Sequence, residues 1–202
     1  WGRYSFVGLA AETVIKVSDY DVSIEKKGEL HKQYKVEDPL TWIEDYQSKF
    51  KVPQLDELPD FNGGLVGYFG YEIIKYIEPK LKNIKKKDEL NVPDILLMVP
   101  KDLLVVDNLT SKVHIITHIN PEKESFEAGL SKLNVIEKNI RELFNFDSTS
   151  TEKIESEDFI SSFGKENFVN AVEKVQKYIA AGDVMQVVPS ERLSCSFKSD
   201  PI

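Results

Sequence analysis

The sequence predicts an α+β protein built from antiparallel β-sheets with flanking helices. Short β-type runs separated by polar turns fill much of the first 120 residues. Two later segments place apolar residues three or four positions apart, which is the spacing of an amphipathic helix. Apolar residues make up 41% of the 202-residue chain, enough to bury a sizeable core.

The N-terminal part is strand-rich. Runs over 3–9, 13–17 and 20–25 alternate apolar and polar residues and are joined by short turns, which is typical of an antiparallel meander. The segment "DPLTWIEDYQSKFKVP" then has helical spacing, with Asp38 as a cap and Pro39 in the first turn. We expect one helix there.

A glycine-punctuated strand follows. The stretch "GGLVGYFGYEIIKYIEPKL" predicts a strand that runs into a short helix ending at Pro79, and the charged residues 80–91 predict an exposed loop. Residues 92–120 supply two or three strands, the last two joined by a turn around Asn108 and Ser111. This arrangement is again expected to be antiparallel.

The C-terminal part begins with a long helix. Its apolar face is predicted to pack on a sheet and comprises Phe126, Leu130, Leu133, Ile136, Ile140 and Phe144. Residues 145–163 lack periodicity and are expected to be a linker. A second helical stripe ends at Gly182, which suits a left-handed cap, and residues 184–197 are expected to return to strand.

Charge and composition exclude several classes of protein. The chain has 26 basic and 34 acidic residues, so its net charge of −8 argues against general affinity for nucleic acid or an anionic membrane. Its apolar runs are far shorter than the roughly 20 residues of a membrane-spanning helix. The single cysteine, Cys195, excludes an internal disulfide and suits a reducing compartment, so we expect a cytoplasmic protein.

Three features could carry chemistry, and each has a structural alternative. Four glycines could form a phosphate cradle or allow close backbone packing: Gly63, Gly64, Gly67 and Gly70. His114 and His118 share a face of a predicted strand and could bind a metal, but no third ligand is evident and solvent exposure is favoured. Cys195 has no nearby histidine and is better explained as a small buried thiol than as a nucleophile.

Gln186 is the candidate catalytic residue. On a strand over 184–197 it would share a face with Val188, Ser190 and Arg192. Spacing alone favours solvent exposure of that face, and Pro189 requires an edge or a bulge.

Four segments in order resemble one enzyme family. They are "WGRYSFVGL", "GGLVGYFGYEIIKYIEP", "PDILLMVPKDLLVVDNLTSKVHII" and "FGKENFVNAVEKVQKYIAAGDVMQVVPSERL". Together they are similar to anthranilate synthase component I, over essentially all 202 residues. The family's chain is longer, so the resemblance implies a truncated chain: an N-terminal region over 1–144, the linker over 145–163, and the start of the chorismate-binding catalytic domain over 164–202.

The resemblance also implies a fold and a reaction. The fold is two antiparallel sheets stacked face to face with helices outside. The reaction is that of a lyase, which converts chorismate and ammonia to anthranilate and pyruvate in the first committed step of tryptophan biosynthesis. It requires Mg²⁺, takes ammonia from a partner glutamine amidotransferase, component II, and is inhibited by tryptophan. The ligands of Mg²⁺ and chorismate belong to the family's C-terminal half, so we expect the 202 residues alone to be inactive.

Two alternatives stay open at this point. Component I of aminodeoxychorismate synthase, from the folate pathway, shares the fold and the amination, although "GRYSFVG" and "QVVPS" favour the anthranilate branch. A non-catalytic ligand-binding or docking module is the other. In related isochorismate-forming enzymes, the position that corresponds to Gln186 looks to be a lysine, a base that can activate water. The resemblance therefore implies that the neutral amide of Gln186 favours amination.

Overall fold

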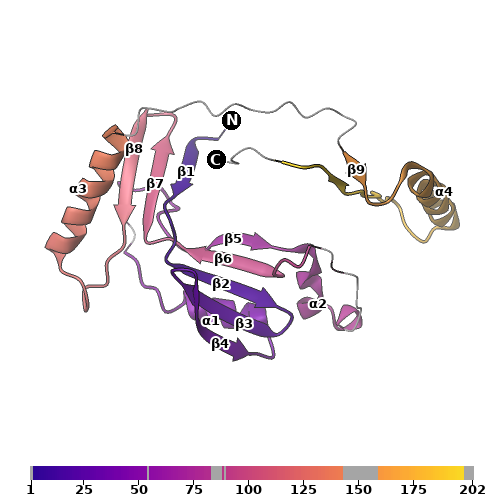
Figure 1. The fold of residues 1–202 in the computed structure, drawn as a ribbon, viewed down its shortest axis with the longest axis horizontal. Helices are drawn as coiled ribbons and strands as arrows, with labels where there is room; N and C mark the ends of the chain where they lie inside the picture. The colour runs from indigo at the N-terminus through magenta and orange to yellow at the C-terminus, as the bar shows by residue number, and fades with distance from the viewer. Residues whose placement is uncertain (1, 54, 83–87, 89, 143–158, 198–202) are drawn as a thin grey trace. The chain divides into compact units, whose positions relative to one another are not determined.

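The computed structural model describes residues 2–53, 55–82, 88, 90–142 and 159–197. It contains two compact units, Trp1–Phe144 and Asn145–Ile202. Both contain antiparallel strand pairs and helices (Figure 1), which confirms the predicted α+β class.

The larger sheet of the first unit has five strands in the order β4-β3-β2-β6-β5, all antiparallel to their neighbours. The strands are β2 (Thr13–Ser18), β3 (Asp21–Lys26), β4 (Glu29–Lys35), β5 (Val66–Phe69) and β6 (Ile95–Val99). One face is packed because apolar residues alternate along the inner strands. The buried cluster of this sheet comprises Ile15, Val17, Val22, Ile24, Ile43, Ile95 and Leu97.

Helix α1 (Pro39–Gln47) contributes Ile43 to that cluster. Its start confirms the sequence prediction: Pro39 occupies the first turn, and Asp38 Oδ1 accepts hydrogen bonds from the backbone N–H groups of Leu40 and Thr41 at 2.9 and 3.4 Å. The carboxylate thus satisfies two N–H groups that have no partner within the helix.

The smaller sheet has the order β1-β7-β8, from β1 (Tyr4–Gly8), β7 (Asp102–Asp107) and β8 (Lys112–Thr117). Its buried cluster is Leu103, Val105 and Ile116. The turn between β7 and β8 confirms the prediction around Asn108 and Ser111, where Ser111 has a φ of 55°. The predicted meander over 3–25 is wrong for its first strand, because β1 pairs with β7 and not with β2.

A long-range ion pair accompanies this pairing. Arg3 donates two hydrogen bonds to the buried Asp107 carboxylate, at 3.3 and 3.0 Å. This bond from Arg3 lowers the pKa of Asp107 below its ordinary value. Alternation defines a strand and its faces but not its partner, so a contact between residues 3 and 107 could not be predicted from the local pattern.

Two helical segments complete the first unit. Helix α3 (Phe126–Glu142) packs against β8 as predicted, and Lys132 Nζ lies 2.8 Å from Asp102 Oδ2 of β7. Phe144, at the end of its predicted face, lies outside the described residues. Strand β5 leads into η1 (Tyr71–Ile73), α2 (Ile74–Ile77) and η2 (Pro79–Leu81), which confirms a short helix ending before Pro79. Half of the predicted loop over 80–91 lies outside the described residues, and η2 occupies its first two positions.

The second unit contains α4 (Lys165–Ala181) and a two-stranded ribbon of β9 (Ile160–Ser161) and β10 (Leu193–Ser194). Gly182 has a φ of 82° and forms the predicted left-handed cap. Most of the predicted linker, 145–163, lies outside the described residues, and β9 occupies part of its end. The strand expected over 184–197 is wrong except at Leu193 and Ser194, because within the described part of the chain only β9 pairs with it and Pro189 has no N–H to donate.

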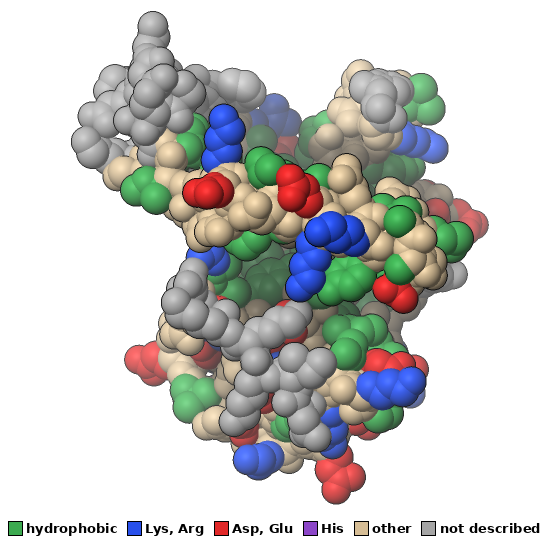
Figure 2. All heavy atoms as spheres, turned by 90° about the vertical axis from the view of Figure 1, so that its right-hand side faces the viewer, with side chains coloured by type: hydrophobic (Ala, Val, Ile, Leu, Met, Phe, Trp, Pro, Cys, Tyr) green, Lys and Arg blue, Asp and Glu red, His purple; other side chains and the backbone are tan. Residues whose placement is uncertain are grey.

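The second unit has little core of its own. No side chain of α4 is buried, and Met185, Val188 and Ile160 are 98%, 78% and 73% exposed. Figure 2, viewed from the side on which Figure 1 draws α4, shows hydrophobic side chains exposed among charged ones. None of the helices in the described ranges is long and apolar enough to cross a membrane.

Candidate functional site

Gln186 lies between the Gly182 cap and β10, in a segment without regular secondary structure. Its side chain is exposed, as is that of the neighbouring Met185. Because the segment is not a strand, the alternation that grouped Gln186 with other polar residues does not apply. Its catalytic role stays a prediction.

The glycine-rich segment is explained by close backbone packing. A Cβ atom at Gly67 would collide with the carbonyl oxygen of Leu96 on β6, and one at Gly70 would lie 2.9 Å from the carbonyl oxygen of Asp94. A Cβ at Gly63 would collide with the ring of His118. Close packing against neighbouring atoms, and not phosphate binding, therefore explains the glycines at these three positions.

His118 is held by the backbone: its Nε2 lies 2.8 Å from the carbonyl oxygen of Asn62. His114 lies on β8, opposite Val105 of β7. Among the described residues, no three side chains of His, Cys, Asp or Glu come together in a way that could hold a metal ion. This part of the chain therefore offers no set of ligands that fits Mg²⁺.

A charged network connects the β2–β3 turn, α2 and β6. Lys75 Nζ lies 2.6 Å from Asp19 Oδ1 and 2.9 Å from Asp94 Oδ2, and the Tyr76 hydroxyl donates to Asp94 at 2.8 Å. Burial acts to raise the pKa of Asp94, but the hydrogen bonds from Lys75 and Tyr76 outweigh it and hold that pKa below its ordinary value. Burial and the same carboxylate raise the pKa of Tyr76. Every member has a partner, so the network is structural.

We expect this network to make the free energy of unfolding depend on pH in the acidic range. A carboxyl whose pKa is lowered by folding contributes stability above its ordinary value of 3.8, and this contribution is lost as pH falls through the folded value. Asp94→Asn should lower the free energy of unfolding by about 1 kcal/mol at pH 7. The difference from the parent should shrink as pH falls below 3.8 in urea titrations, whereas Asp45→Asn, an exposed change on α1, should alter little. An Asp94→Asn deficit independent of pH would contradict this account.

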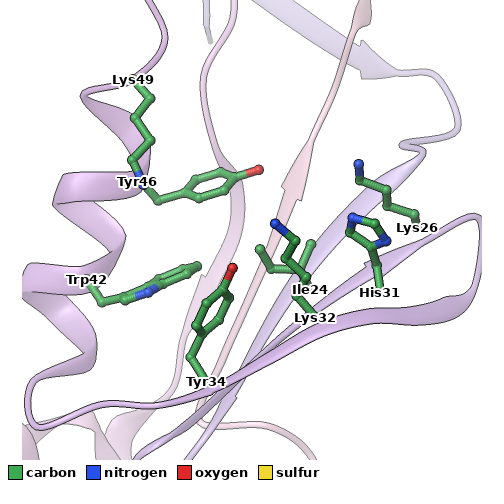
Figure 3. A pocket seen from close by; sticks show the side chains of 8 residues that line it. All are labelled: Ile24, Lys26, His31, Lys32, Tyr34, Trp42, Tyr46 and Lys49. Carbon is green, nitrogen blue, oxygen red and sulfur yellow. The ribbon is translucent and has the colours of Figure 1, made fainter.

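A groove lined by several polar groups lies between α1 and the β3–β4 hairpin (Figure 3). Its volume is about 280 Å³. Rings of α1 and β4 form one wall: Trp42 stacks on Tyr46 with centroids 5.4 Å apart, and Tyr34 lies 5.5 Å from Trp42. Lys49 Nζ lies 5.9 Å from the Tyr46 ring centroid. The opposite wall carries Lys26, His31 and Lys32, with Ile24 between the walls.

Sequence reasoning missed this groove, although part of its signal was present. Trp42 and Tyr46 are four residues apart and share one face of α1, and Lys49 follows three residues later, just beyond the end of the helix. Lys32 and Tyr34 are two apart on β4 and share a face of the sheet. The strand β4 itself was not predicted, so nothing in the sequence placed these two sets next to each other.

Comparison with known proteins identifies the family. The family model described as chorismate binding enzyme matches residues 7–202. Anthranilate synthase component 1 of Pseudomonas putida is 44% identical over 207 residues, covering 100% of this chain and 42% of that protein. The Aquifex aeolicus protein of the same name is 34% identical, with 100% and 41% covered.

A solved structure has the same fold. The crystal structure of anthranilate synthase component I from Streptococcus pneumoniae TIGR4 matches with a TM-score of 0.74 at 24% identity, covering 99% of this chain and 43% of that one. The chain thus spans about two fifths of the length of these relatives. The match of the family model over nearly the whole chain shows that this protein belongs to the family of chorismate-binding enzymes.

Proposed function

We propose that this chain is part of an anthranilate synthase component I, whose full-length subunit converts chorismate and ammonia to anthranilate and pyruvate. The observation that carries the proposal is the similarity over the whole chain to proteins of that name, at 34–44% identity. Relatives of that name do not favour the folate-pathway alternative or a non-catalytic module. The lyase activity belongs to the full-length subunit.

The proposal includes the partners and surroundings of that subunit. Ammonia would come from a glutamine amidotransferase, tryptophan would be the feedback inhibitor, and the cytoplasm would be the location. Mg²⁺ would be required, and its ligands would lie outside the described residues, which offer no such set. When bound, the metal would stabilise negative charge on the oxygens of the substrate.

Within this chain, Gln186 is the residue to which we assign a role in the reaction. A primary amide donates and accepts hydrogen bonds but has no basic nitrogen, so it cannot take a proton from water. Ammonia is already a competent nucleophile and needs no such base. A neutral side chain at this position would therefore allow amination and disfavour attack by water.

In the full-length subunit, Gln186→Ala removes the hydrogen bonds that the amide can donate and accept, and it should reduce ammonia-dependent kcat/KM by at least about tenfold, or roughly 1.4 kcal/mol of transition-state stabilisation. The measurement is anthranilate fluorescence with chorismate, ammonium and Mg²⁺. Gln176→Ala, which changes an exposed glutamine on α4, is the matched control and should keep parental kinetics. Equal kinetics for both variants would refute the role of Gln186.

The function itself is tested by identifying the product. The full-length subunit carrying this sequence should form anthranilate and pyruvate in equal amounts from chorismate and ammonium. Chromatography of the products separates the alternatives, because an aminodeoxychorismate synthase would release an aminated ring and no pyruvate. That second outcome would overturn the proposal whatever the effect of Gln186→Ala.

A further inference from the structure

The groove between α1 and the β3–β4 hairpin is basic, although the chain as a whole carries a net charge of −8. Three lysines and His31 line it, and its lining contains no Asp or Glu. Neither Lys26 nor Lys32 makes an ion pair with another residue in the described ranges. Both amino groups are therefore available to an anion, and the basic lining of the groove attracts anions.

The opposite wall offers a surface for a flat ring. Tyr34 is 37% exposed, and Trp42 and Tyr46 are half-buried, so ring surface remains open to solvent. Such surface gains free energy when a second ring packs against it, stacked or edge to face. The rings project into the groove from α1 and β4, facing the amino groups of the other wall (Figure 3).

Two hydroxyl groups also point into the groove. Figure 3 shows the phenol oxygens of Tyr34 and Tyr46 directed towards its centre, and neither has a hydrogen-bond partner among the described side chains and backbone groups. Burial and the nearby Tyr34 raise the pKa of Tyr46, so its hydroxyl stays protonated at neutral pH. A protonated phenol is a donor for an oxyanion.

The size of the groove limits the ligand. Its volume of about 280 Å³ lies at the small end of ligand pockets, which suits a molecule with one ring. We propose that this groove binds a small planar carboxylate, with its ring against Tyr34, Trp42 and Tyr46 and its carboxylate towards Lys26 and Lys32. The proposal is independent of the reaction of the full-length subunit.

The test uses two probes of nearly equal shape, 4-fluorobenzoate and its neutral amide, 4-fluorobenzamide. Their binding to the 202-residue chain is followed by ¹⁹F NMR titration. The carboxylate should bind saturably and at least about tenfold more tightly than the amide, because only the carboxylate makes charge-assisted hydrogen bonds. Equal binding of the two probes would overturn the proposal.

Paired variants locate the site. Lys26→Gln with Lys32→Gln should weaken 4-fluorobenzoate binding by about tenfold. Lys112→Gln with Lys123→Gln removes the same charge from exposed positions elsewhere and should leave binding nearly unchanged. Equal losses in the two double variants would show that net charge alone attracts the probe, which would refute a site in the groove.

The aromatic wall is tested separately by Tyr34→Leu, a change at a partly exposed position on the edge strand β4. Circular dichroism first confirms that the variant is folded, and weaker binding of 4-fluorobenzoate is then expected. Unchanged binding would show that the ligand's ring does not pack against the aromatic wall, and the proposal would be overturned. A glutamate hexapeptide is the final competitor: if it displaces the probe and binds more tightly, the groove is a docking surface for an acidic protein segment, and the proposal fails.

Discussion

The 202-residue chain on its own is expected to form no measurable anthranilate from chorismate, ammonium and Mg²⁺. The physical reason lies in the second unit, where no side chain of α4 is buried and the segment around Gln186 has no strand partner. A catalytic group must be held in place by packed neighbours to act. The described residues also offer no set of side chains that could hold a metal.

The measurement is continuous anthranilate fluorescence at saturating chorismate. A full-length subunit carrying the same sequence, assayed in parallel, is the positive control and should be active. Hydrogen exchange gives a second readout, since the amides of α4 should exchange much faster in the 202-residue chain than those of β2, β3 and β6. Turnover by the short chain above the rate without protein would contradict the prediction.

Gly67→Val should destabilise the first unit by about 3 kcal/mol, the largest single-residue effect that we expect. Gly67 lies on β5 opposite Leu97 of β6, and any Cβ there would collide with the backbone carbonyl of Leu96. Backbone cannot move aside as a flexible side chain can, so β5 would have to separate from β6. Urea unfolding followed by circular dichroism measures the loss.

Gly8→Val is the matched control, because Gly8 is also a glycine of a β-strand, the last residue of β1, but a Cβ there meets nothing within 4 Å. Its effect should stay within about 0.5 kcal/mol. If the two variants unfold at the same urea concentration, the close approach between β5 and β6 is not what requires glycine at position 67.

Several elements could be predicted from the sequence because their signals are local. The Asp38 cap, the turn at Ser111 and the left-handed Gly182 each depend on residues within a few positions, and the structure contains all three. Alternation likewise predicted β2 and β3, whose buried residues form the core of the larger sheet. The family could also be identified from short motifs distributed along the chain.

The candidate site was much less predictable. The sequence singled out Gln186 by its place in an expected strand, but a strand exists only where a partner supplies hydrogen bonds, and only Leu193 and Ser194 have one. The groove brings Lys32 and Tyr34 of β4 together with Trp42 of α1. Nothing in the sequence near β4 indicates that it contacts α1, and nothing near α1 indicates that it contacts β4.

What the sequence by itself determined is therefore most of the helices, the caps and the inner strands β2 and β3, because backbone preferences and apolar periodicity act over a few residues. What only the tertiary structure decided is which segments meet. The pairing of β1 with β7 joins residues about a hundred positions apart, and it depends on packed faces and on the Arg3–Asp107 ion pair. The need for glycine at position 67 has the same origin, since it is set by the Leu96 carbonyl of a neighbouring strand and not by any residue beside it in the chain.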